Sequence, residues 1–430
     1  MISILFILIV ILLIISLFVY DFDIIAPPVI ICAVYLFSIY AAMYNIDTWK
    51  INLSEITISY ILIGLIVFCV SSFIVKRKYA NKPIEKKPIT EIEFRKNKLI
   101  IIYLVATVCA YLYLKEISSI VNRYGSDYSM AMAEFRADFS YGEQNLSFIS
   151  NQAYKVLTCI SFVFLYIFCN NVGATNKWRK NLIFLLPVCI YIYASLRSGS
   201  RTQLIQIFTM FIVLLFIFQK IYGRYKKGKI LRYLLYISSG SIAFLIIFSA
   251  IRFFVGRQNE SNLTDYISMY VGGSIQLFDL YLKHPEEVTS KGMETFGSLY
   301  NNFVKFGFID GKEVIMHKEF RYSNGILLGN VYTSFRAFHH DLGLFGIIFF
   351  QFIEGLFFSI YYEKMKRIKN KKPISIALVM YGILMMPLFE HAIQEQLFSN
   401  YLCLNTLVIY ILLFFIILYL KPKSHVTKSF

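Results

Sequence analysis

Long apolar runs, separated by short polar and basic segments, dominate this sequence. A helix rises about 1.5 Å per residue, so about 20 apolar residues cross the roughly 30 Å hydrocarbon core of a bilayer. Apolar length and charged flanks together predict about eleven transmembrane helices, with ten and twelve as alternatives. We expect these helices at residues 2–20, 26–44, 56–75, 99–117, 153–171, 181–196, 202–219, 233–251, 341–362, 374–390 and 401–420.

The interval between the eighth and ninth predicted helices is too long for a simple connection. It contains two stretches, 263–282 and 295–309, with apolar and aromatic residues at helical spacing, and we expect both to lie in the headgroup layer. The chain then divides into an N-terminal transmembrane helix bundle (1–251), an extracytoplasmic loop segment with short membrane-lying helices (252–340) and C-terminal transmembrane helices (341–430). The predicted fold class is an all-α integral membrane protein.

Composition agrees with this class, because 57% of the residues are hydrophobic and only 16% are charged. The first apolar run has neither a basic n-region nor a small-residue cleavage site, so we expect it to be a retained span instead of a signal peptide. The seven cysteines lie in apolar runs without a C-x-x-C pair, which argues against zinc or thiol redox chemistry. H-E-x-x-H, Walker A and G-x-S-x-G motifs are absent from the sequence, so metalloprotease, ATPase and serine hydrolase functions lack support.

The net charge of +17 follows from membrane topology and does not indicate nucleic-acid binding. More than half of the 43 Lys and Arg residues lie in five segments beside apolar runs. Short cytoplasmic loops are enriched in Lys and Arg, so these segments should face the cytoplasm and the N-terminus should lie outside. An even number of spans with an inward N-terminus is the alternative. The five segments are 76–98, 177–180, 220–232, 364–372 and 421–428.

A short charged cluster separates the sixth and seventh predicted helices. Arg197 and Arg201 are four residues apart, close to one helical turn, and Ser198 and Ser200 flank a glycine between them. Guanidinium groups bind phosphate oxygens in a bidentate manner, and the serines add hydroxyl groups. The cluster predicts a site for a lipid-linked phosphate at the outer rim of the bundle; the alternative is that both arginines extend to lipid headgroups.

Four further arginines lie in the long outer segment. Any two of them could join the first pair around a diphosphate, since the outer side carries fewer basic residues than the inner side. Individually, each is also explained as a solvated charge or a headgroup contact. They are Arg252, Arg257, Arg321 and Arg336.

His340 and Asp341 bring an imidazole and a carboxylate to the outer mouth of the ninth predicted helix. A sugar hydroxyl that acts as acceptor needs a group to orient it or to take its proton, and either residue is suited to this. Asp341 is equally explained as the N-cap of the following helix. Glu395, at the next outer turn, could line the same cavity. The pattern Asp21-Phe22-Asp23 matches the D-x-D motif of metal-using glycosyltransferases, but the topology places it on the cytoplasmic side.

These residues resemble those of the Wzy-type oligosaccharide repeat-unit polymerases, the O-antigen and capsular polysaccharide polymerase family of bacterial surface polysaccharide synthesis. The resemblance covers most of the chain and is specific at residues 196–201, 270–274, 330–333 and 341–346. It implies a GT-C-like helical fold and a metal-independent inverting glycosyl transfer at the outer face of the bacterial plasma membrane, without a cofactor. The growing chain on undecaprenyl diphosphate would be the donor, and a newly flipped lipid-linked repeat unit would be the acceptor.

On this resemblance we assign expected roles. Arg197, Arg201 and Arg252 would stabilise the departing lipid diphosphate, and His340 or Asp341 would orient or deprotonate the acceptor. The partners would be the undecaprenyl-diphosphate-linked oligosaccharide and membrane lipids, with a chain-length regulator and a flippase as further candidates. Substrate-binding roles are expected for Ser198, Ser200, Arg257, Arg321, Tyr332 and Arg336.

Two alternative functions remain. A ligase that moves the finished glycan to another acceptor would use the same donor and the same arginines. A flippase or exporter of lipid-linked oligosaccharide belongs to a different class, and transporters tend to show paired halves and charge at the bilayer midplane. The clustered outer arginines favour an enzyme.

Overall fold

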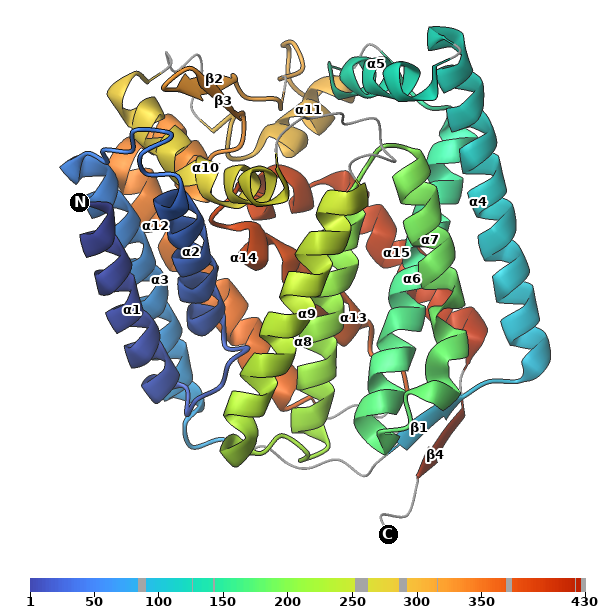
Figure 1. Ribbon diagram of the computed structural model, residues 1–430. Helices are drawn as coiled ribbons and strands as arrows, with labels where there is room; N and C mark the ends of the chain where they lie inside the picture. Colours follow the sequence, from blue (N-terminus) through green and yellow to red (C-terminus); the bar gives the residue numbers. More distant parts are fainter. Residues whose placement is uncertain are drawn as a thin grey trace. The chain divides into compact units, whose positions relative to one another are not determined.

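The structure is a computed structural model that describes residues 1–83, 90–125, 127–141, 144–251, 262–285, 292–314, 316–368, 373–421 and 423–426 (Figure 1). Over these residues the protein is mostly helical, with two short two-stranded sheets. Each of the eleven apolar runs predicted from the sequence contains helix. The prediction of an all-α, multi-pass membrane protein is therefore confirmed at this level, whereas the GT-C-like arrangement stays a prediction.

Within the described residues, nine helical segments are long and apolar enough to cross a membrane. Two further apolar segments, Ile376–Glu390 and Leu404–Leu420, are shorter, so the number of spans stays a prediction. The nine are Ile2–Val19, Pro27–Tyr44, Glu55–Tyr79, Lys96–Tyr124, Phe148–Thr175, Arg179–Arg197, Thr202–Ile221, Ile230–Ala250 and Ser334–Lys366.

The chain forms two compact units, each assembled from segments that are distant in sequence. Unit 1 comprises Met1–Pro83, Ser261–Lys364 and Pro387–Thr406, and unit 2 comprises Ile84–Glu260, Met365–Met386 and Leu407–Phe430. The first three helices therefore pack with the second half of the chain. This grouping differs from the three consecutive segments into which the sequence pattern divides the chain.

Unit 1 is built around helices that lie side by side near the N-terminus (Figure 1). These are α1 (Ile2–Val19), α2 (Pro27–Tyr44) and α3 (Glu55–Tyr79). Helix α2 begins with two prolines, whose fixed φ suits a first helical turn, and the Ser54 hydroxyl accepts a hydrogen bond from the Thr57 amide to cap α3. The starts of α2 and α3 are therefore set by local sequence as well as by hydrophobicity.

Helix α10 (Leu263–Lys283) packs tightly against α2. At Gly272 an added Cβ would lie 2.4 Å from the Ala42 amide nitrogen, so only glycine permits this helix crossing. The buried face of α10 includes Ile275, Phe278 and Tyr281. This predicted outer helix is thus part of the core of unit 1.

The remaining elements of unit 1 include α11 (Gly297–Lys305), the antiparallel strands β2 (Arg321–Ser323) and β3 (Ile326–Gly329), α12 (Ser334–Lys366) and the short π-helix Leu397–Tyr401. Helix α14 (Met386–Glu390) precedes the last of these. Helix α12 consists of two helical segments joined at Gly343, whose backbone has φ +62° and ψ −150°. The first, short segment carries His340 and Asp341.

One end of unit 1 is basic. Lys76, in the last turn of α3, forms an ion pair with Asp21 at 3.2 Å, and the Tyr362 hydroxyl near the end of α12 donates a hydrogen bond to Asp23. The ends of α1, α3 and α12 therefore meet here, and the start of α12 lies at the other end of a 33-residue helix. Assignment of this basic end to the cytoplasm stays a prediction of the positive-inside rule.

Unit 2 is arranged around α6 (Phe148–Thr175), which is mostly buried and packs against α4 (Lys96–Tyr124), α7 (Leu186–Arg197) and α8 (Thr202–Ile221). An antiparallel strand pair, β1 (Thr90–Glu93) with β4 (Lys423–Val426), joins distant parts of the chain. The other elements of unit 2 are α5 (Tyr128–Tyr141), a 3₁₀ segment (Arg179–Leu185), a short 3₁₀ turn (Lys227–Lys229), α9 (Ile230–Ala250), α13 (Ile376–Leu384) and α15 (Leu404–Leu420).

Unit 2 also has one basic end. There the Asn171 side chain accepts a hydrogen bond from the Ile92 amide at 2.8 Å and donates to the Ile92 carbonyl at 3.0 Å. The Tyr222 hydroxyl donates to Asn170 at 2.8 Å, so the ends of α6 and α8 converge beside β1. The turn at 197–201 connects the opposite ends of α7 and α8.

Candidate functional site

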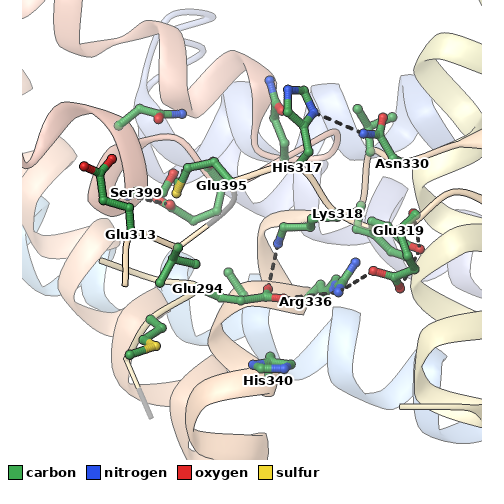
Figure 2. Close-up of a pocket in the computed structure, with 18 residues that line it drawn as sticks. Glu294, Glu313, His317, Lys318, Glu319, Asn330, Arg336, His340, Glu395 and Ser399 are labelled. Atoms are coloured by element: carbon green, nitrogen blue, oxygen red, sulfur yellow. Dashed lines mark hydrogen bonds and ion pairs between the residues drawn. The ribbon is translucent and has the colours of Figure 1, made fainter. Parts of the chain in front are cut away.

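Unit 1 contains a cavity of about 730 Å³ (Figure 2). Its wall is formed by the segments around α11 and strands β2 and β3, by the first turns of α12 and by the loop before the π-helix. A cavity of this size falls in the range of roughly 300–1,000 Å³ that holds small ligands. The lining side chains include Glu294, Glu313, His317, Lys318, Glu319, Asn330, Tyr332, Arg336, His340, Gln394, Glu395, Ser399 and Asn400.

An ion-pair network crosses the wall of the cavity. The Arg336 guanidinium lies 2.7 Å from a Glu319 oxygen and 3.1 Å from a Glu294 oxygen, and the Lys318 ammonium lies 2.7 Å from the other Glu294 oxygen (Figure 2). Arg336 is only 1% exposed and also stacks 4.1 Å from the ring of Tyr332. Charge pairing and stacking together hold this guanidinium in place.

Both carboxylates of the network remain ionised near neutral pH. Burial opposes ionisation of Glu294, but Lys318 and Arg336 outweigh it and hold the pKa below its usual value. At Glu319 burial is likewise overcome by Arg336 and by a hydrogen bond from the Tyr332 hydroxyl, so its pKa is also lowered. The cavity therefore keeps fixed, paired charges.

Arg321 supports the network from behind the cavity wall. Its Nε lies 2.9 Å from Glu319, and its two terminal nitrogens donate to the carbonyl oxygens of Leu280 and His284 at 2.8 and 2.9 Å. It ties the β2 strand to the end of α10. Arg321 and Arg336 are thus close to the same carboxylate, but both are engaged by protein oxygens.

His340 lines the cavity and Asp341 lies behind it. The Asp341 carboxylate accepts hydrogen bonds from the Thr295 amide at 2.8 Å and the Glu294 amide at 3.4 Å. The capping interpretation of Asp341 is wrong, because both carboxylate oxygens accept hydrogen bonds from amides of the distant 294–295 loop and not from the first turn of the helical segment that follows Gly343. His340 Nδ1 is 3.6 Å from Asp341 Oδ1, close enough for an ion pair but longer than a hydrogen bond. This pair can act as a base and its orienting group if the contact tightens on substrate binding.

Glu395 is the most deeply buried carboxylate lining the cavity. Its two oxygens accept hydrogen bonds from the amides of Phe398 and Ser399 at 2.7 and 2.8 Å, which orient the group at the start of the π-helix. Burial, reinforced by the negative charge of Glu354, raises the pKa of Glu395 to about 7 in spite of these two bonds. Among the described residues no cation lies within ion-pair distance of Glu395.

The predicted arginine cluster forms a compact turn in unit 2. Gly199 has φ +77°, and an added Cβ would lie 2.3 Å from the Arg136 side chain, so glycine is required there. The Ser198 hydroxyl donates to the Ser195 carbonyl at 2.8 Å and Ser200 donates to Gln203 at 2.6 Å. Both hydroxyls thus hold the turn together.

The two arginines of this turn have different environments. Arg201 is 4% exposed, donates to the Phe248 carbonyl at 3.2 Å and lies 4.3 Å over the Phe248 ring. Arg197 is half-buried and lies 4.7 Å over the ring of Tyr128. Arg197 is therefore the more accessible of the two.

The structure thus brings four predicted residues to one place, since Tyr332, Arg336 and His340 line the cavity and Arg321 supports its wall. Asp341 stands behind His340. Arg252 and Arg257 lie outside the described residues.

Sequence reasoning named Glu395 as a possible lining residue, and Glu395 does line the cavity. It missed the ion-pair partners of Arg336: Glu294, Lys318 and Glu319 come from irregular segments in which no periodic pattern marks a contact. For Lys318 and Glu319 the sequence signal is the alternation of charge along 318–321. Within the described residues no group of three or more His, Cys, Asp or Glu side chains could hold a metal ion.

Comparison with known proteins gives no relative: no family model, no curated protein and no solved structure matches the chain.

Proposed function

We propose that this protein is a Wzy-type polymerase that joins undecaprenyl-diphosphate-linked oligosaccharide repeat units into surface polysaccharide at the outer face of the bacterial plasma membrane. The observation that carries the proposal is the cavity of unit 1. In a chain with many apolar helices, it gathers charged and hydrogen-bonding side chains around the start of α12, opposite the basic end of that unit. A polar cavity at this end of the unit suits a sugar on a lipid carrier.

The proposed reaction is an inverting displacement at an anomeric carbon. A hydroxyl oxygen of the acceptor sugar forms the new glycosidic bond while the bond from the anomeric carbon to the diphosphate breaks. His340, oriented by Asp341, takes the hydroxyl proton, and the electron pair of the broken bond leaves with undecaprenyl diphosphate. Cations have to stabilise the charge of that leaving group, and Arg197, Arg201 and Arg252 stay the candidates predicted from the sequence for this role, without a metal ion or cofactor.

Arg321 and Arg336 have a different role in this proposal from the substrate binding that the sequence predicts. Both are engaged with Glu319, so we assign them to positioning the carboxylates of the cavity. Diphosphate binding by the 197–201 turn of unit 2 stays a prediction from the sequence, and Arg197 is the more accessible cation of that turn.

A flippase or exporter of lipid-linked oligosaccharide is the second candidate, and one observation favours it. Inside unit 1 the Glu354 carboxylate lies 2.9 Å from His391 Nε2 and 2.6 Å from the Gln351 amide nitrogen, and Tyr35 lies 3.0 Å from His391 Nδ1. All four side chains are buried. Ionisable groups within membrane spans often mark transport pathways. A ligase that uses the same donor is a third candidate.

The test is chain extension by purified protein in nanodiscs supplied with lipid-linked repeat units. Gel analysis should show glycan ladders with the wild-type protein and with Arg179→Ala, an arginine at the basic end of unit 2. Arg197→Ala should abolish the ladders at equal abundance. Absence of extension by folded wild-type protein would contradict the polymerase, and carrier movement across vesicles without extension would support the flippase.

A further inference from the structure

The charge of the cavity in unit 1 is unfavourable for a diphosphate. Four carboxylates line it, those of Glu294, Glu313, Glu319 and Glu395, against the two permanent cations Lys318 and Arg336. Burial raises the pKa of Glu395 to about 7, so this carboxyl is only partly ionised near neutral pH, but the wall still carries no excess of permanent positive charge. A second anion brought into this space would be repelled by Glu313 and by the ionised form of Glu395.

The two cations of the wall are already paired with carboxylates. Lys318 is bound to Glu294, and Arg336 is shared between Glu294 and Glu319. Moving Lys318 onto a phosphate would take from Glu294 one of its two cationic partners, and moving Arg336 would take one partner from both Glu294 and Glu319. An anionic ligand would therefore have to overcome both the repulsion and this loss.

The rest of the wall is suited to hydroxyl groups. Asn330, Gln394 and Asn400 contribute carboxamides, which present donors and acceptors side by side, and Ser399 adds a hydroxyl. Carboxylates are strong acceptors for sugar hydroxyls as well as partners for amino groups. Met293 and Met316 supply apolar surface on which the C–H face of a sugar ring can lie.

We propose that this cavity binds the sugars of the acceptor, uncharged or basic, and excludes the diphosphate of the carrier. The proposal rests on the proposed function for the identity of its ligand. It assigns Asn330 and Asn400 as sugar-binding residues and Glu313 as a determinant of specificity against acidic sugars. In this arrangement His340 meets a hydroxyl group and not a phosphate.

Equilibrium dialysis of the full-length protein in nanodiscs tests this inference. One probe is the repeat-unit oligosaccharide released from its lipid by mild acid and labelled at its reducing end; the other is inorganic pyrophosphate as competitor. Asn330→Ala should weaken oligosaccharide binding by up to about tenfold, the effect of one lost hydrogen bond. The matched control is Asn324→Ala, at the tip between β2 and β3 and outside the cavity lining, which should bind normally.

The opposite results would overturn the inference. These are failure of the oligosaccharide to bind, equal binding by Asn330→Ala and wild type, or displacement of the oligosaccharide by pyrophosphate. Failure of the proposed function is recognised separately, because oligosaccharide bound in the cavity by a protein that never extends chains would leave the inference standing. Chain extension by a protein whose oligosaccharide binding does not depend on Asn330 would support the proposed function and overturn the inference.

Discussion

The side chains that line the cavity have different roles. Arg336 is a permanent cation that the wall itself uses, between Glu294 and Glu319 and over the ring of Tyr332. His340 is a lining group whose contact with Asp341 raises its pKa above the usual value, and as an imidazole it can gain and lose a proton near neutral pH. The division between structural charge and reactive group follows from these contacts.

Glu395 gives a prediction for the pH dependence of stability. Its pKa is raised from 4.5 to about 7, so the folded protein binds this proton more tightly than the unfolded chain does. The resulting stabilisation is complete below pH 4.5 and is lost as pH rises through about 7. The full effect is on the order of 3 kcal/mol, since one pKa unit corresponds to about 1.4 kcal/mol.

Glu395→Gln removes the titrating group. The free energy of unfolding, measured by denaturant titration in detergent at pH 5.5 and 8.5, should fall with pH less steeply in this variant than in wild type. Glu313→Gln, which removes an exposed carboxylate of the same cavity, is the matched control and should retain the wild-type slope. Equal slopes for all three proteins would refute the assignment.

Among the helices, α12 positions the site through its break at Gly343. The backbone there has φ +62° and ψ −150°, a region accessible almost only to glycine. The break separates a short segment with Arg336, His340 and Asp341 from the long apolar segment. It allows the reactive residues to face the cavity while the rest of α12 crosses unit 1.

Gly343→Ala should therefore destabilise the protein by about 1–3 kcal/mol, the cost of an unfavourable backbone conformation. The control is Gly240→Ala in α9, because an added Cβ meets nothing within 4 Å at either glycine. In the regular helix, alanine should stabilise by about 0.5–1 kcal/mol. Thermal unfolding in detergent measures both effects. An unchanged unfolding temperature for Gly343→Ala would show that alanine adopts the backbone conformation at the break without strain, against this prediction.

The helices were the part of the fold most open to prediction from sequence. A bilayer demands a fixed length of apolar residues, and each predicted run contains helix. The packing of α10 against α2 was not predictable, because the close approach at Gly272 depends on a partner more than 200 residues away. The pairing of Glu294 with Lys318 was hidden for the same reason, since neither residue belongs to a periodic pattern.

For the molecule as a whole, hydrophobicity and charge give a consistent orientation within each unit. In unit 1, Lys76 and its neighbours mark one end and the cavity lies at the start of α12, the opposite end. In unit 2, the loops rich in Lys and Arg lie beside β1, and the 197–201 turn connects the other ends of α7 and α8. Each unit therefore has a basic end, and the opposite end holds the cavity in unit 1 and the arginine turn in unit 2.

His340 should take part in extending a lipid-linked glycan. The most direct measurement is the rate of ladder formation in nanodiscs by wild type, His340→Gln and His284→Gln, an exposed histidine of unit 1 outside the cavity lining. Loss of a general base typically slows a reaction by about 10²–10⁴-fold. Such a loss is expected for His340→Gln alone; a wild-type rate for His340→Gln would contradict a catalytic role of this histidine.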